Sequence, residues 1–218
     1  MLEIKNITKH YGNHLVFSGV CLSGQRGDII RISGPSGAGK TTLLRCITGL
    51  ENFESGEIVI DGKTVQSDKV LLPPNRRKTA MVFQDLALWP HMNVRQNIDF
   101  VSSSIIKNKS ERYYWNEELL RKFHIEHKKN SFPSELSGGE QQRVALARSV
   151  ANKPGILLLD ESFSNLDPAL ANEIIGQTVD HCKTNRILLL IVTHSESNLH
   201  NYPVISFRLS NGILEKEN

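Results

Sequence analysis

The stretch GPSGAGKTT, residues Gly34–Thr42, decides the fold of this chain. It fits the pattern G-x-x-x-x-G-K-[ST] and follows the apolar run Asp28–Ile32, which supplies the preceding strand that this pattern requires. In such a loop the glycines let successive amides point at phosphates, Lys40 supplies a positive charge, and the Thr41 hydroxyl can ligate magnesium. The alternative is a glycine-rich turn that happens to contain a lysine, and the preceding strand argues against it.

Further apolar runs predict the sheet that this loop belongs to. Ile156–Leu159 and Ile187–Val192 are apolar on both faces and are separated by helical segments, which is typical of buried parallel strands. The segment GEIVIDG, Gly56–Gly62, alternates instead and predicts a small antiparallel addition in the N-terminal part. We therefore expect an α/β fold with a parallel-sheet core and an N-terminal antiparallel β addition.

The middle of the chain has a helical pattern. Asn93 and Gln96 can cap a helix. Its apolar face would hold Val94, Ile98, Val101 and Ile105. A second helix is predicted around Glu117–His124, with Leu119, Leu120 and Phe123 turned inward. We predict that residues 84–151 form an inserted α-helical subdomain. Residues 1–83 and 152–218 then form the core of a single domain.

Composition excludes several classes of protein. The 218 residues are 39% hydrophobic and 22% charged, with a net charge of +3, as in an ordinary globular chain. Basic residues are scattered apart from Arg76–Lys78 and His127–Lys129, which we interpret as solvated loops, so no nucleic-acid partner is expected. The three cysteines lie far apart, which argues against disulfides and zinc. No apolar run is long enough for a signal peptide or a membrane span.

Two acids follow the apolar run that begins at Ile156. In ILLLDE, Asp160 emerges at the carboxyl end of the predicted strand, where open α/β sheets bind ligands. Asp160 can contribute to a magnesium shell, and the adjacent Glu161 can act as general base toward water. A strand end with two solvated acids is the alternative. His194, in LLIVTHS, follows another such run and can hydrogen-bond a terminal phosphate, although a lone histidine there is usually structural.

The stretch ELSGGEQQR, Glu135–Arg143, has the chemistry of a second anion site. Ser137 and Glu140 form a capping box, which predicts a helix start. Gly138 and Gly139 in the first turn each disfavour a helix by roughly 1 kcal/mol relative to alanine. Close approach of an anion to bare amides at the helix N-terminus would explain them. A tight turn before an amphipathic helix explains the stretch equally well when it is taken alone.

Together these motifs resemble the nucleotide-binding subunit of ATP-binding cassette (ABC) transporters over nearly the whole chain. GPSGAGKTT resembles the family's phosphate loop, LSGGEQQR its signature sequence, and ILLLDE its magnesium strand with the catalytic glutamate. VFQD is similar to the switch loop, SNLD to the loop that crosses the dimer interface, and THS to the switch histidine. Tyr11, in KHYG, matches the aromatic residue that stacks on adenine, although a tyrosine there is also common as packing.

The resemblance assigns roles residue by residue. It implies ATP contacts from Tyr11, Gly34, Pro35, Ser36, Gly37, Ala38, Gly39, Lys40, Thr41, Thr42 and Gln84. It implies contacts to the nucleotide of a second chain from Ser137, Gly138, Gly139 and Glu140, and a dimer interface at Asn165, Leu166 and Asp167. It implies magnesium ligation by Thr41, Gln84 and Asp160, and catalysis by Glu161, His194 and Lys40.

The function that the resemblance implies is ATP hydrolysis that drives a membrane permease. ATP and Mg2+ are the expected cofactors. The expected partners are a second copy or a paralogous ATPase subunit, permease subunits and, in importers, a substrate-binding protein. The location would be cytoplasmic, on the inner face of the cell membrane. Ser162 and Asn165 replace the proline and alanine that the family often has, which puts loop stiffness and intersubunit contacts in doubt.

The direction of transport stays open at this point. Phe83–Ile98 resembles importer subunits for sugars, anions, iron or polyamines, but the short segment after His194 leaves no room for their usual regulatory domain. Leu86, Leu88 and Trp89 either receive a permease helix or belong to the core. A soluble ATPase of the same superfamily, acting in DNA repair or translation, is the alternative function. A small-molecule kinase would not require LSGGEQQR.

Overall fold

The structure is a computed structural model, and it describes residues 1–164, 166–193, 199 and 201–217. Within these ranges the strands are β1 (Leu2–Tyr11), β2 (His14–Gly24), β3 (Ile29–Ser33), β4 (Ser55–Ile60), β5 (Lys63–Gln66), β6 (Thr79–Val82), β7 (Ile156–Asp160), β8 (Leu188–Val192), β9 (Val204–Ser210) and β10 (Ile213–Lys216). The α-helices are α1 (Lys40–Thr48), α2 (Val94–Ser102), α3 (Lys109–Lys122), α4 (Gly138–Val150) and α5 (Pro168–Thr184). Short 3-10 helices cover Pro74–Arg76, Glu126–Lys128 and Pro133–Glu135.

A mostly parallel sheet forms the centre of the molecule. Its order among the described strands is β10-β9-β3-β8-β7-β6, and all neighbours are parallel except the hairpin of β9 and β10. The three apolar runs predicted as parallel strands are β3, β7 and β8. Because successive side chains of a strand point to opposite faces, Ile156 and Leu158 enter one core while Leu157 and Leu159 enter the other. Burial on both faces explains why β7 and β8 have no polar position before their ends. In β3 the exception is Arg31, which is buried and pairs with Glu217 at 2.8 Å.

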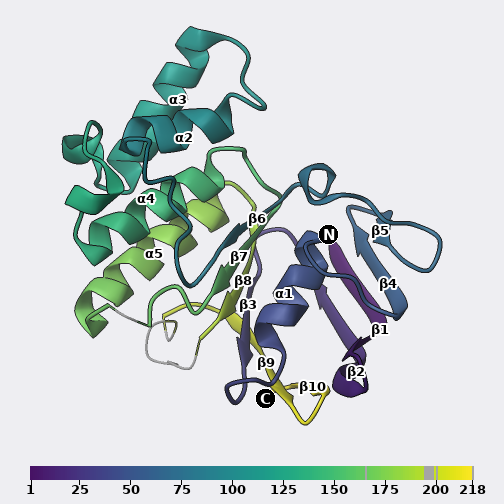
Figure 1. The fold of residues 1–218 in the computed structure, drawn as a ribbon. Helices are drawn as coiled ribbons and strands as arrows, with labels where there is room; N and C mark the ends of the chain where they lie inside the picture. Colours follow the sequence, from purple (N-terminus) through teal and green to yellow (C-terminus); the bar gives the residue numbers. More distant parts are fainter. Residues whose placement is uncertain (165, 194–198, 200, 218) are drawn as a thin grey trace.

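The two faces of this sheet have different cover. Figure 1 shows α2, α3, α4 and α5 on one side of the sheet, and α1 on the other side, next to a second sheet. The second sheet is antiparallel, in the order β2-β1-β4-β5, and contains the predicted strand within GEIVIDG as β4. Leu43, Leu44 and Ile47 of α1 are fully buried in the core between the two sheets. The predicted α/β core with an antiparallel addition is confirmed.

The helical pattern of the middle of the chain is confirmed in part. Asn93 and Gln96 form the predicted capping box at the start of α2. Ile105 does not continue the apolar face of this helix, because α2 ends at Ser102 and the Ile105 side chain is exposed. The helix predicted around 117–124 begins earlier, at Lys109, because Asn108 caps its first turn.

The capping box at the start of α4 is also present, but its two glycines have different surroundings. Ser137 accepts a hydrogen bond from the Glu140 amide, and the Glu140 carboxylate accepts one from the Ser137 amide. A Cβ on Gly139 would lie 2.5 Å from a methyl group of Leu170 on α5. Gly139 is therefore explained by helix packing. Only Gly138 is open to the outside, with its nearest neighbour, Leu166, 3.9 Å from a Cβ position.

One basic residue predicted to lie in a solvated loop is buried. Arg77 is 1% exposed, and its guanidinium donates hydrogen bonds to the carbonyl oxygens of Cys46, Ile47 and Leu72 and to the Gln66 side chain. Burial lowers the pKa of Arg77 to about 10, so it remains charged at neutral pH. The prediction was wrong for Arg77 because the last carbonyls of a helix need donors. This side chain supplies them at the C-terminus of α1.

Replacing Arg77 with alanine should lower the free energy of unfolding by about 3 kcal/mol, because several buried acceptors lose their donor at once. Urea denaturation followed by circular dichroism measures this change. Arg76→Ala is the matched control, because Arg76 is exposed, and it should change stability by less than about 0.5 kcal/mol. Equal stabilities of the two variants would contradict a structural role for Arg77.

Candidate functional site

The loop between β3 and α1 is shaped by glycines in conformations that other residues rarely adopt. Gly34 has φ 141° and Gly39 has φ 95°. A Cβ on Gly34 would lie 2.1 Å from the carbonyl oxygen of Leu209, and one on Gly39 would lie 2.5 Å from a methyl group of Val16. The loop is thus packed against β9 and β2 at the start of α1. Its backbone amides lie at the positive end of a helix, which is suited to phosphate binding.

Lys40 is held inside this loop. Its side chain is 4% exposed, and Nζ donates hydrogen bonds to the carbonyl oxygens of Gly34 and Pro35, at 2.9 Å each. The Glu161 carboxylate lies 3.5 Å from the same nitrogen. The ammonium group therefore already occupies the centre of the loop, with its charge partly balanced by one acid. Phosphate oxygens are stronger acceptors for this group than the two neutral carbonyls.

Thr41 and Asp160 meet directly. The Thr41 hydroxyl donates a hydrogen bond of 2.9 Å to the Asp160 carboxylate at the end of β7. Burial raises the pKa of Asp160, the Thr41 hydrogen bond opposes that shift, and the nearby Glu161 charge adds to it. A buried carboxylate next to a hydroxyl has the hard oxygen donors that Mg2+ prefers, and Mg2+ in phosphate sites takes few protein ligands. The residues present therefore fit magnesium.

Glu161 occupies an unusual backbone position just after β7. It has φ 48°, in the left-handed region, and its amide donates to the carbonyl oxygen of Val192 on β8. Such a conformation is disfavoured for a residue with a side chain and is often found at functional sites. The tie to β8 fixes Glu161 at the carboxyl edge of the sheet, beside Lys40.

Gln84 lies in the same pocket as the residues predicted to ligate magnesium. A pocket of about 650 Å³ is lined by Thr41, Arg45, Phe83, Gln84, Asp85, Ala87 and Asp160. The structure therefore brings together the three side chains that the sequence assigned to the metal. Among the described residues no cluster of three or more His, Cys, Asp or Glu residues could hold a metal by itself.

The loop after Gln84 is held by Arg148 of α4, a residue that the sequence analysis missed. Its guanidinium donates to the carbonyl oxygens of Ala87, at 2.6 Å, and Leu86, at 2.7 Å, and lies 4.7 Å from the centre of the Trp89 ring. Leu86 and Ala87 have φ 59° and 43°, so two consecutive residues are strained. Leu86 packs partly against the core, as does Leu88. No sequence signal pairs Arg148 with a loop so distant in the chain.

Tyr11 lies near the loop and has one face occupied. Its ring is 48% exposed, and the Lys9 ammonium lies 4.7 Å from the ring centre while pairing with Glu51 at 3.0 Å. Tyr11 ends β1 and pairs with His14 across the β1–β2 hairpin. Val16, near the start of β2, lies against Gly39, which places the turn of this hairpin beside the phosphate loop. The contact between Lys9 and Tyr11 could have been predicted from the sequence, because residues i and i+2 of a strand lie on the same face.

The residues of the signature stretch lie elsewhere. In Figure 1, α4 and α1 are on opposite sides of the central sheet. Among the described residues, no hydrogen bond or ion pair joins residues 137–140 to residues 34–42. Ser137 and Gly138 are exposed, whereas the Glu140 carboxylate is engaged by Ser137 and lies 3.4 Å from Lys128. The hydrogen bonds that Glu140 accepts from Ser137, mainly the one from the Ser137 backbone amide, lower the pKa of Glu140.

The remaining predicted residues are placed only in part. Asp167 caps α5 by accepting from the Leu170 amide, and Leu166 is partly buried against the core. Asn165 and His194 lie outside the described residues, so their predicted roles in the dimer interface and in catalysis stay predictions.

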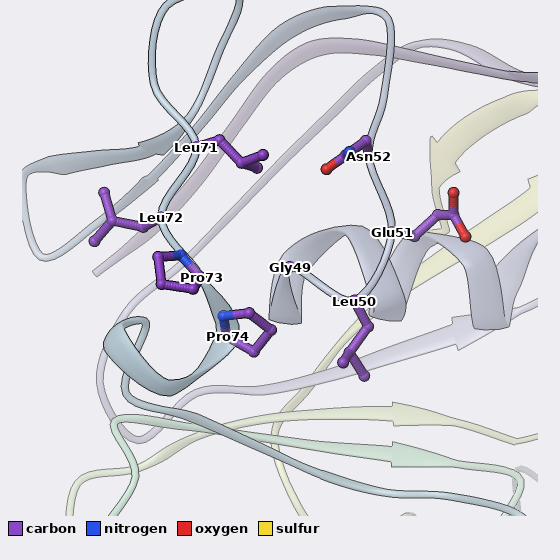
Figure 2. A pocket seen from close by; sticks show the side chains of 8 residues that line it. All are labelled: Gly49, Leu50, Glu51, Asn52, Leu71, Leu72, Pro73 and Pro74. Atoms are coloured by element: carbon purple, nitrogen blue, oxygen red, sulfur yellow. The ribbon is translucent and has the colours of Figure 1, made fainter.

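A separate pocket of about 370 Å³ lies at the other end of α1. Figure 2 shows Leu71, Leu72, Pro73 and Pro74 on one segment and Gly49, Leu50, Glu51 and Asn52 on the other. Because it follows the C-terminus of α1, it is not part of the site around the phosphate loop. In the part of the chain that the structure describes, no helix is long and apolar enough to cross a membrane.

Comparison with known proteins identifies the family of this chain. The ABC transporter family model matches residues 17–164. The chain is 41% identical to the glutamine transport ATP-binding protein GlnQ of Escherichia coli, over 89% of this chain and 81% of that protein. It is 41% identical to the spermidine/putrescine import ATP-binding protein PotA of Nitrosospira multiformis, over 90% of this chain but only 53% of that protein. The chain thus spans about half the length of this polyamine relative.

Solved structures share the fold. The structure of cbiO1 from Clostridium perfringens, part of the ABC transporter complex cbiONQ, has a TM-score of 0.87 and 28% identity, covering 98% of this chain and 86% of that one. The chain therefore belongs to the ABC transporter family, as an ATP-binding subunit.

Proposed function

We propose that this chain binds Mg·ATP, closes on a second copy or a paralogous subunit in head-to-tail fashion, and hydrolyses ATP to drive import through a membrane permease. The observation that carries this proposal is the cluster of Lys40, Thr41, Asp160 and Glu161 at one edge of the sheet, together with a signature helix on the other side of that sheet. The four clustered residues belong to one chain, so in this proposal the signature helix that covers the nucleotide comes from a second chain.

The contacts support the following proposed roles within one half-site. Lys40 exchanges its two carbonyl acceptors for phosphate oxygens when ATP enters. Thr41 and Asp160, with Gln84 in the same pocket, hold magnesium, which neutralises charge on the phosphates. Glu161 accepts the proton of the attacking water, and its position beside Lys40 keeps it at the phosphate end of the nucleotide. Tyr11 stacks on adenine with the face that Lys9 leaves open.

The other half of each site comes from the partner chain. Ser137 and Gly138 present an exposed helix start to solvent, with amides at the positive end of α4. A two-fold dimer places this helix start over the nucleotide of the partner and so creates two composite sites. Residues 165–167 form part of the contact between the two chains. ATP binding then favours association, and hydrolysis favours release.

The transported substrate is proposed to be an amino acid or a polyamine. Relatives at similar identity carry names for glutamine, arginine/ornithine, cystine and spermidine/putrescine transport. In this proposal the chain works at the cytoplasmic face of the membrane with permease subunits and a substrate-binding protein. No role with nucleic acid is proposed. A soluble ATPase in DNA repair or translation is the competing function.

Replacing Glu161 with glutamine should leave ATP binding intact and lower hydrolysis by roughly 100-fold or more, the usual contribution of a general base. The variant should elute as a dimer with ATP in gel filtration and as a monomer without it. Glu215→Gln is the control, because Glu215 is an exposed acid on β10. Turnover in Glu161→Gln equal to that of the control would remove Glu161 from its proposed role.

Mixing a Lys40→Ala chain with a Ser137→Arg chain tests the shared site. The heterodimer contains one composite site with both native residues and one site with both substitutions. We expect it to bind one ATP tightly, whereas each mutant homodimer binds weakly at both sites. Nucleotide binding to heterodimers purified through two different tags measures this. If they bind no better than the homodimers, the signature helix does not act on the partner's nucleotide.

Purification of the tagged chain from detergent-solubilised membranes should recover an integral membrane partner. Phe100→Asp should weaken this recovery, because Phe100 is 57% exposed and its ring packs against Trp89, next to the loop after Gln84. Ile213→Asp, at a similarly exposed residue of β10, should not change it. A ribosomal or chromosomal partner in place of a membrane protein would overturn the transport function and favour the competing one.

A further inference from the structure

A third cavity lies at the edge of the central sheet opposite the phosphate loop. Its volume is about 360 Å³, within the range of small-molecule sites. Its lining residues come from the turns that enter β3, β6, β7 and β8, from the turn after β4, and from α3, α4 and α5. They are Arg26, Asp61, Lys78, Trp115, Val150, Lys153, Pro154, Gly155, His181, Asn185 and Ile187. The lining therefore joins the helical segment to the amino-terminal ends of the parallel strands.

The lining has an excess of positive charge. Arg26, Lys78 and Lys153 are cationic, and Asp61 is the acid among the lining residues, already paired with Arg26 at 2.7 Å. Lys78 and Lys153 therefore face the cavity region without an acid in the lining to balance them. Both have left-handed backbones, with φ 53° and 50°, at the turns that enter β6 and β7. Two uncompensated cations in one cavity favour an anionic occupant.

The inner part of the cavity is mostly apolar, and the buried His181 ring forms part of its wall. Val150, Pro154 and Ile187 are buried, and the Trp115 ring has the Lys153 ammonium 4.8 Å from its centre. His181 is 3% exposed, and among the described residues its Nδ1 has no hydrogen-bond partner. Burial lowers the pKa of His181 to about 4, so the ring is neutral.

We propose that this cavity binds a small organic anion, a phosphate monoester or carboxylate with a short apolar portion. Lys78 and Lys153 pair with the anionic group, and the apolar portion lies against Trp115 and Ile187. His181 forms part of the buried wall of the cavity. Because the nucleotide half-site lies at the carboxyl edge of the same sheet, both sites can be occupied at once. This cavity is independent of the proposed transport function.

The chain provides its own reporter for this site. Its two tryptophans are Trp89 and Trp115, so a Trp89→Phe variant leaves Trp115 as the single tryptophan. Adding Lys40→Ala prevents phosphate compounds from acting through the nucleotide site. Butyl phosphate is the probe, because it combines a dianion with a short apolar chain and does not absorb tryptophan light. Inorganic phosphate and butanol test the two parts separately.

We expect butyl phosphate to change Trp115 emission saturably, with a Kd below about 1 mM, and inorganic phosphate and butanol to bind more weakly. Lys153→Gln and Lys78→Gln should each weaken binding roughly tenfold, because each removes a charge-assisted contact. Lys69→Gln, at an exposed lysine in the turn after β5, should leave it unchanged. Absence of saturation, equal binding of butanol, or an equal loss in Lys69→Gln would overturn the proposal.

Discussion

Parallel pairing of β3, β8 and β7 places everything else in this site. Strands that run in the same direction end at the same edge, so the loop after β3 and the acids after β7 must meet there. The hydrogen bond from Thr41 to Asp160 is the direct consequence. It joins the first turn of α1, which follows β3, to the end of β7, and β8 lies between those two strands. Burial on both faces fixes the register of these strands, because a shift of one residue would move each side chain into the opposite core.

This arrangement separates the phosphate loop from the signature helix. The sheet lies between α1 and α4, and each of these helices packs into a different core. The positive end of α1 faces the nucleotide side of its own chain, while the start of α4 remains exposed. The acid that we propose to be catalytic, Glu161, and the phosphate loop are already side by side within one chain. In the proposed dimer, a second chain would add a further set of amides and exclude water, which would strengthen every electrostatic contact in the site.

Local chemistry made most of the fold predictable. The apolar runs predicted β3, β7 and β8 correctly, because parallel strands in the middle of a sheet are buried on both faces. The capping boxes at Asn93 and Ser137 predicted the starts of two helices correctly. Arg77 was mispredicted because its acceptors lie in segments far apart in the chain, where sequence spacing carries no information. Gly139 shows the same limit, since its neighbour Leu170 is brought there only by helix packing. The acids at 160 and 161 were predictable, but the pairing of Glu161 with Lys40 was not.

Helix α4 connects two parts of the site that the sequence treats separately. Its first turn carries the exposed Ser137 and Gly138, and Arg148 near its other end donates to two carbonyls of the loop that follows Gln84. Leu86 and Ala87 in that loop are held in left-handed conformations that cost about 1–3 kcal/mol each. Short charge-assisted hydrogen bonds offset such strain only while the helix stays in place. A shift of α4 relative to the sheet must therefore either carry this loop with it or release its strain, and Gln84 lies directly before that loop.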